Sequence, residues 1–144
     1  MPEKQSMMHL EIVSISDGFD LLKAQQELQK RLHELECYDY PPHIPAETRG
    51  DLLASVRFND EAIDSERQEV MDRLPWKRWK KSHREGLNEP VSDEDRYEIK
   101  FELIDELHFL TNKMISAGFE SWEEVERWYL TKNRENFARQ ERNY

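Results

Sequence analysis

Apolar residues recur along this chain at the three- and four-residue spacing of helices, and strand-like alternation is nearly absent. The first helical stretch covers about residues 19–36, with Ser16 or Asp17 as its expected N-cap. It ends before the segment 37–45, because the prolines of that segment cannot continue a helix. The second stretch covers about residues 48–74 and also ends at a proline.

Two further helical stretches begin at capping signals. Ser92, with Asp95 three residues later, resembles a capping box at the start of the third stretch, and Gly118 suits the position just after its last turn. The fourth stretch opens with the same pattern at Ser121 and Glu124. We expect this last helix to run close to the end of the chain.

The four stretches predict an all-α fold, a helical bundle of about four main helices. At 144 residues, the chain is expected to form a single domain over residues 1–144. The segment at about 76–92, between the second and third stretches, is polar and carries Gly86 and Pro90. We therefore expect a mobile loop there.

The composition changes this picture in one respect. Only 37% of the residues are hydrophobic and 36% are charged, which is polar for a globular monomer. Four tryptophans, five tyrosines and six phenylalanines nevertheless argue against a disordered chain. A lean core with many aromatic residues indicates that some apolar surface is buried between subunits, so we expect dimerisation to complete the bundle.

The charge and the cysteine count narrow the class of protein. The formal net charge is −10, which argues against nucleic acid as a partner because a diffuse nucleic-acid binder is normally basic. The single cysteine, Cys37, excludes an intrachain disulfide and fits a reducing compartment. The N-terminal residues lack the apolar core of a signal peptide, and no apolar run approaches the roughly 18 residues that span a membrane. We expect a cytoplasmic protein without a membrane partner.

Two pairs of carboxylates are the main chemical signal. Glu66 and Glu69 are three residues apart on the second stretch, and Glu102 and Asp105 have the same spacing on the third. Acids at this spacing lie on one face of a helix. If the two faces meet, four carboxylates converge, and they repel one another unless a cation lies among them. Hard oxygen donors favour Mg²⁺ or Mn²⁺ over zinc, which indicates a site for metal-assisted phosphoryl transfer.

The periodicity of the third stretch leaves a second interpretation open. Its acids lie opposite its apolar side, as they do on an ordinary solvated face, and periodicity alone favours that interpretation. Two details favour a site instead: Lys113 alone compensates four acids on this face, and Phe109 lies within the acidic arc. The apolar side consists of Ile99, Leu103, Ile104, Leu107, Leu110 and Met114.

The strong basic cluster of this acidic chain is WKRWKK at 76–81. Its tryptophans could stack on a base while its lysines and arginine bind the phosphates. Equally, the indoles could anchor the helix end in the core. The C-terminal segment carries Lys132, Arg134, Arg139 and Arg142. These side chains suit phosphates, although sequence alone favours an ordinary charged helix end.

Neutral amides and one histidine complete the candidates. Gln25, Gln26 and Gln29 present donors and acceptors, as recognition of a base edge requires, although surface glutamines are common. His108 follows Asp105 by about one turn. A lone histidine on a helix is more often structural than catalytic, and if this one acts we expect it to line or orient the site.

Together these motifs resemble those of the all-α nucleoside triphosphate pyrophosphohydrolases. Within that superfamily the resemblance is to the dimeric dUTPase branch, and closest to the T4-type phage dCTP/dUTP pyrophosphatases. It touches all four helical stretches, is specific in the third stretch and the tail, and is loose in the first. The motifs are EIKFELIDELHF at 98–109, Gly118, YLTKNRENFARQ at 129–140, the terminal Tyr144, WKRWKK at 76–81 and the glutamines at 25–29.

The resemblance implies a homodimer in which acids of two helices bind the metal. Carried over by motif, these acids are Glu66, Glu69, Glu102 and Asp105, with Glu69 and Glu66 as the catalytic residues. One departure affects the expected number of metal ions. The wider superfamily often has two adjacent acids at the start of the first pair, whereas here Ser65 precedes Glu66.

The resemblance also assigns residues to the nucleotide. Lys77, Lys80, Lys132 and Arg139 are expected to bind phosphates. Trp76 belongs to the loop expected to cover the substrate. The residues expected around the nucleotide or its base are Gln25, Gln29, Trp79, His108, Phe109, Asn136 and Gln140.

The expected activity is Mg²⁺-dependent hydrolysis of dCTP or dUTP, or both, to the monophosphate and pyrophosphate, in control of the nucleotide pool; Mn²⁺ could replace Mg²⁺. The compartment would be the host cytoplasm if a phage encodes the chain. A glutamine amide can turn to serve cytosine or uracil, so the sequence does not choose between them. One alternative is a non-catalytic helical interaction protein with a solvated acidic face, whose tryptophans contact a partner. Single-strand nucleic-acid binding is another, against which the net charge argues.

Overall fold

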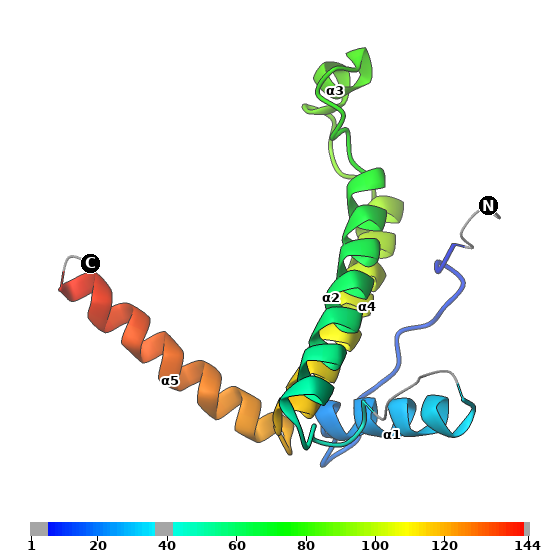
Figure 1. The fold of residues 1–144 in the computed structure, drawn as a ribbon. Coiled ribbons are helices and arrows are strands. Elements are labelled where there is room, and N and C mark those ends of the chain that lie inside the picture. Colours follow the sequence, from blue (N-terminus) through cyan, green and yellow to red (C-terminus); the bar gives the residue numbers. More distant parts are fainter. Residues whose placement is uncertain (1–5, 37–41, 143–144) are drawn as a thin grey trace. The chain divides into compact units, whose positions relative to one another are not determined.

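The computed structural model of the chain describes residues 6–36 and 42–142, and the all-α expectation is confirmed. These residues contain no strand, and none of their helices combines the length and apolar character needed to cross a membrane. Cys37 and Tyr144 lie outside the described residues. The helices are α1 (Leu21–Glu34), α2 (Arg49–Asp72), α3 (Lys81–Gly86), α4 (Asp93–Ala117) and α5 (Trp122–Glu141) (Figure 1).

The four long helices are those that the sequence predicts, and two of them begin at the expected caps. The Ser92 hydroxyl accepts a hydrogen bond from the Asp95 backbone N–H at 3.0 Å, before α4. The Ser121 hydroxyl accepts one from the Glu124 N–H at 3.1 Å, at the start of α5. Gly118 follows α4 with a φ of +106°, a conformation that favours glycine. The helix α3 lies within the segment for which the sequence predicts only a loop.

The expected cap of α1 at Ser16 or Asp17 is wrong, because Asp20 takes that position. Its carboxylate accepts a hydrogen bond from the Lys23 backbone N–H at 3.0 Å. The same carboxylate also accepts from the N–H of Trp122, the first residue of α5, at 3.1 Å. Burial works against the charge of Asp20, but these N–H groups hold its pKa below the ordinary value of 3.8. One carboxylate thus caps α1 and ties it to α5.

The chain divides into two compact units, and α2 and α4 contribute residues to both. Among the described residues, the first unit comprises 6–15 and 57–110. The second unit comprises 16–36, 42–56 and 111–142.

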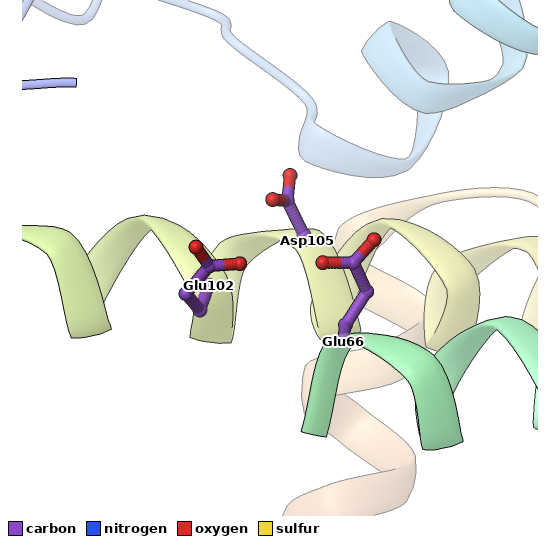
Figure 2. Close-up of side chains that lie close together, drawn as sticks. All are labelled: Glu66, Glu102 and Asp105. Carbon is purple, nitrogen blue, oxygen red and sulfur yellow. The ribbon is translucent and has the colours of Figure 1, made fainter. Parts of the chain in front are cut away.

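In the first unit α2 and α4 lie side by side and antiparallel, and they meet through polar side chains (Figure 1). Asn59 is fully buried, and Glu98 and Glu102 are only 1% and 2% exposed. Figure 2 shows Glu66 of α2 beside Glu102 and Asp105 of α4. We call this contact the polar seam.

In the first unit, by contrast, the apolar side of α4 is exposed. Leu103, Ile104 and Leu110 are 50%, 47% and 40% exposed. The solvated acidic face that periodicity favours is therefore wrong, because α4 turns its acids toward α2. Burying carboxylates is costly unless they are hydrogen-bonded or paired with cations, so the polar seam needs compensating partners.

The second unit combines a small apolar core with polar pairs. Leu22 of α1 and Ile115 of α4 are fully buried. The Ser55 and Ser116 hydroxyls are 2.5 Å apart, and the Ser116 carbonyl accepts a hydrogen bond from the Ala46 N–H at 2.9 Å. The amide-rich face of α1 also turns inward, which places glutamines in this interior.

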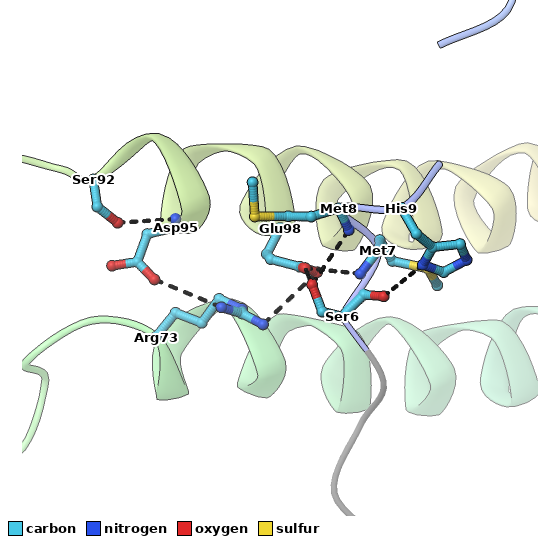
Figure 3. Close-up of polar contacts among 8 residues, drawn as sticks. All are labelled: Ser6, Met7, Met8, His9, Arg73, Ser92, Asp95 and Glu98. Carbon is cyan, nitrogen blue, oxygen red and sulfur yellow. Dashed lines mark hydrogen bonds and ion pairs between the residues drawn. The ribbon is translucent and has the colours of Figure 1, made fainter. Parts of the chain in front are cut away.

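In the first unit, an N-terminal strap, Ser6–Leu10, is fastened to α4 (Figure 3). The Ser6 hydroxyl and the Met7 backbone N–H both donate to Oε1 of Glu98, at 2.5 and 2.7 Å. The Tyr97 hydroxyl donates to the Leu10 carbonyl. Contacts across about ninety residues of sequence therefore hold the strap on the helix.

Glu98 also pairs with a cation that directly follows the end of α2. Its Oε2 lies 3.7 Å from Arg73 Nη2, while Nη1 of the same guanidinium lies 3.6 Å from Asp95 Oδ1. The Ser6 hydroxyl is the main reason that the pKa of Glu98 lies below the ordinary value of 4.5. Burial opposes this shift, and the Met7 N–H and Arg73 support it. Glu98 is thus a buried carboxylate held in its charged form.

This lowered pKa predicts that Glu98 stabilises the fold at neutral pH and less so in acid. A group whose pKa is depressed in the folded state stabilises above its unfolded pKa, and that stability is lost as the pH falls through the folded value. Urea unfolding of the wild type between roughly pH 7 and pH 3 should show a loss of unfolding free energy below about pH 4.5 that is shallower in Glu98→Gln. Glu61→Gln, which removes an exposed carboxyl of the same unit, should retain the wild-type slope. Parallel curves for the wild type and Glu98→Gln would contradict this assignment.

Candidate active site

Three carboxylates of the polar seam form a compact group. Glu66 comes from α2, and Glu102 and Asp105 come from consecutive turns of α4. One oxygen of each lies within 4.8 Å of the others, and Figure 2 shows the three side chains around a common space. Glu102 is buried, while Glu66 and Asp105 are half-buried.

The donor chemistry of this group suits a divalent cation. Carboxylates this close repel one another when all are ionised, and burial strengthens the repulsion. A cation bound by the three oxygens would remove it. Oxygen donors without histidine or cysteine favour Mg²⁺ or Mn²⁺ over zinc. The residues present therefore fit the metal that the sequence predicts.

The fourth expected ligand, Glu69, is not part of this group. It lies on α2 three residues after Glu66 and is half-buried. Three residues along a helix correspond to a rise of about 4.5 Å, so its carboxylate is displaced along the polar seam from that of Glu66. The role of Glu69 stays a prediction, and this offset suits a residue that acts beside the metal ligands.

Asp64, the acid that precedes Ser65, lies outside this group. Asp64 is exposed, and its carboxylate pairs with Arg67 at 3.1 Å on the surface of α2. It does not belong to the group formed by Glu66, Glu102 and Asp105. The polar seam thus offers three clustered carboxylates in this part of the structure.

Two candidates follow the carboxylates along α4. His108 and Phe109, three and four residues after Asp105, are both half-buried. Their proximity to the acids along the helix is consistent with the expected place beside the nucleotide, and their roles stay predictions.

The two indoles of the basic-aromatic segment differ in exposure. Trp76 is half-buried and donates from Nε1 to Asp72 at 3.3 Å, so it is tied to the end of α2. Trp79 is 72% exposed and packs edge-on against Trp76, with ring centroids 5.8 Å apart. Lys77 lies with its Nζ 5.7 Å from the Trp76 ring centroid, and Lys80 is exposed. Trp79 and the lysines are therefore accessible to a ligand, whereas Trp76 anchors the segment.

Two of the residues expected to contact the base, Gln25 and Gln29, lie on α1 in the second unit. Gln25 and Gln29 are 4% and 3% exposed, so they are not the surface glutamines that the sequence allowed. The Gln25 side-chain N–H donates to Oδ1 of Asn112 at 2.8 Å. The Gln29 Oε1 is buried and has no hydrogen-bond partner among the described residues. Asn112 had no role assigned from sequence; its place on the polar face of α4 was the available signal.

The tail candidates lie on α5, also in the second unit. Lys132, Asn136 and Gln140 are exposed and recur at four-residue spacing, and Arg139 is half-buried. The Arg139 Nε lies 3.2 Å from a Glu135 carboxylate oxygen, which Arg142 Nη2 also contacts at 2.8 Å. Residues at these spacings lie on one face of a helix, and their roles at the nucleotide stay predictions.

Comparison with known proteins identifies clear relatives. The chain is 40% identical over 141 residues to the dCTP pyrophosphatase of Enterobacteria phage LZ5, covering 86% of this chain and 80% of that protein. It is 34% identical over 139 residues to the dCTP pyrophosphatase of Enterobacteria phage T4, with the same coverage. A DNA replication protein of phage T4 is 33% identical over 129 residues, which span 79% of this chain but 32% of that protein. No protein-family model and no solved structure matches the chain.

Proposed function

Because this chain belongs to the family of the phage dCTP pyrophosphatases, we propose that it hydrolyses dCTP and dUTP to the deoxynucleoside monophosphate and pyrophosphate. The observation that carries the proposal is the group of three carboxylates within 4.8 Å in the polar seam. Such a group is what a triphosphate hydrolase needs to hold a divalent cation against the phosphate chain.

Glu66, Glu102 and Asp105 would hold Mg²⁺ or Mn²⁺. When bound, such an ion neutralises charge on the triphosphate and lowers the pKa of a water molecule. Glu69 lies next along α2 and is the residue that orients the attacking water and accepts its proton. Water adds across the anhydride between the α- and β-phosphates, and pyrophosphate leaves.

Cations of the chain balance the negative charge that builds up on the leaving pyrophosphate. Lys77 and Lys80 come from the segment before α3, and Lys132 and Arg139 come from α5. A guanidinium can grip two phosphate oxygens at once, whereas a lysine acts as a point charge.

Side chains that can both donate and accept hydrogen bonds surround the base in this proposal. Cytosine presents an amino group where uracil presents a carbonyl, and an amide serves either by turning. Aromatic rings supply stacking surface. The residues concerned are Gln25, Gln29, Trp79, His108, Phe109, Asn136 and Gln140.

Burial of the acids argues against the rival function, a non-catalytic interaction protein with a solvated acidic face. Its premise requires that water covers the acids of α4, but Glu98 and Glu102 are buried. The exposed apolar residues of α4 support a different kind of interaction. We propose that a second copy of this chain covers the apolar row formed by Leu103, Ile104 and Leu110. An exposed apolar surface of this kind is normally buried in the functional assembly.

Substitutions of the carboxylates test the site. Asp105→Asn, Glu102→Gln and Glu69→Gln should each lower the rate of pyrophosphate release from dCTP and dUTP by at least about 100-fold, with helicity retained. The assay uses a panel of deoxynucleoside triphosphates with Mg²⁺ and then with a chelator, which should abolish turnover. Glu61→Gln on the exposed side of α2 serves as the matched control. Unchanged turnover in Asp105→Asn or Glu69→Gln would defeat the assignment of that residue.

The dimer proposal predicts a change in mass when the apolar row is charged. Light scattering after size-exclusion chromatography should give twice the mass of the 17.4 kDa chain for the wild type. Ile104→Lys should give the mass of one chain, because a buried lysine at an apolar interface is strongly unfavourable. Leu87→Lys, at an apolar position of similar exposure after α3, should stay dimeric. A wild-type protein with the mass of one chain would refute the proposal.

A further inference from the structure

Glu98 is a buried carboxylate for which the proposed reaction has no use. It is on the polar seam, 1% exposed, and precedes Glu102 by four residues of α4. Four residues rise about 6 Å along a helix, so Glu98 lies one turn from the metal-binding group. Its partners in the fold include Ser6, Met7 and Arg73, none of which belongs to the metal-binding group.

The two oxygens of Glu98 have separate partners. Oε1 accepts the hydrogen bonds of the N-terminal strap, from Ser6 and Met7. Oε2 faces Arg73 at 3.7 Å (Figure 3). The strap therefore fixes the carboxylate in the orientation that presents its second oxygen to Arg73.

Arg73 is held by two long ion pairs. Its guanidinium lies 3.6 Å from Asp95 and 3.7 Å from Glu98, and its side chain is 28% exposed. Distances of this size are longer than those of a tight charge-assisted hydrogen bond. The position of Arg73 thus depends on the charges around it. Both of those charges precede Glu102 and Asp105 along α4.

Arg73 is also a potential competitor of a metal ion. A guanidinium binds carboxylates in a bidentate manner, and its long side chain can cover one helical turn of about 5.4 Å. If Glu98 lost its charge, the nearest buried carboxylate along α4 would be Glu102. A guanidinium paired with Glu102 would oppose the binding of a divalent cation there by occupancy and by charge.

We propose that Glu98 is a positioning residue of the metal site: oriented by the N-terminal strap, it retains Arg73 and so keeps that guanidinium from competing with a divalent cation at Glu102. The inference rests on the proposed function, because it takes Glu66, Glu102 and Asp105 as the metal ligands. It gives the strap a function in the site, although its residues are about ninety positions away from α4 in sequence.

The test measures binding of Mn²⁺ to the full chain without nucleotide, from the electron paramagnetic resonance signal of the free ion. Glu98→Gln should raise the Kd for Mn²⁺ about tenfold, and Glu98→Gln with Arg73→Gln should restore it to within about twofold of the wild type. Arg73→Gln alone should bind at least as tightly as the wild type. A merely structural role for Glu98 predicts no rescue, because the double variant loses both partners of the pair.

Two outcomes separate this inference from the proposed function. If the wild type does not bind Mn²⁺, or Glu102→Gln binds it as the wild type does, the metal site itself is wrong. If Glu102→Gln abolishes binding but Glu98→Gln binds as the wild type does, only the role of Glu98 is wrong. Failure of the double variant to bind more tightly than Glu98→Gln also overturns that role.

Ser6→Ala provides a second test if circular dichroism shows that Glu98→Gln does not fold. It removes one donor to Glu98 and leaves every charge in place, so the Kd for Mn²⁺ should rise about two- to threefold and Arg73→Gln should reverse the change. Ser14→Ala, at an exposed position beyond the strap, is the matched control. A Kd in Ser6→Ala equal to that of the control overturns the inference.

Discussion

The structure depends on the contact of two acidic helix faces in the polar seam between α2 and α4. Buried carboxylates cost several kcal/mol each unless partners compensate for the loss of water. The seam meets this constraint in two ways. Glu98 is compensated within the chain, by the strap and Arg73. Where Glu66, Glu102 and Asp105 come together, we propose that a divalent cation offsets their mutual repulsion, which makes the same group useful for binding a triphosphate.

This arrangement links the architecture to the proposed reaction. Because the polar side of α4 faces α2, its apolar side is left at the surface of the first unit, and a second copy of the chain becomes the natural cover. The acidic site and the proposed dimer are thus two consequences of one helix orientation. The strap adds a long-range element, since it ties the N-terminal residues to the turn before Glu102.

The sequence was sufficient for the four long helices and for the three carboxylates that the structure brings together. Proline positions and the Ser92 and Ser121 caps define the helix ends, because these signals act locally. The spacing of Glu102 and Asp105 places both on one face for the same reason. The cap of α1 was placed too early, although Asp20 is a residue type that commonly caps helices; its second bond, from Trp122 far along the chain, gives no signal in the local pattern. The burial of the acidic face was not predictable from periodicity, which assumes that apolar sides turn inward, and the engagement of Glu98 depends on residues about ninety positions away.

The proposed reaction requires that the acids of the polar seam bind a divalent cation. Anomalous diffraction from crystals soaked with Mn²⁺ and a non-hydrolysable dCTP analogue tests it most directly. We expect a manganese peak bounded by Glu66, Glu102 and Asp105, with the phosphate chain of the analogue against it. A peak elsewhere on the molecule, or an analogue bound away from these carboxylates, would contradict it.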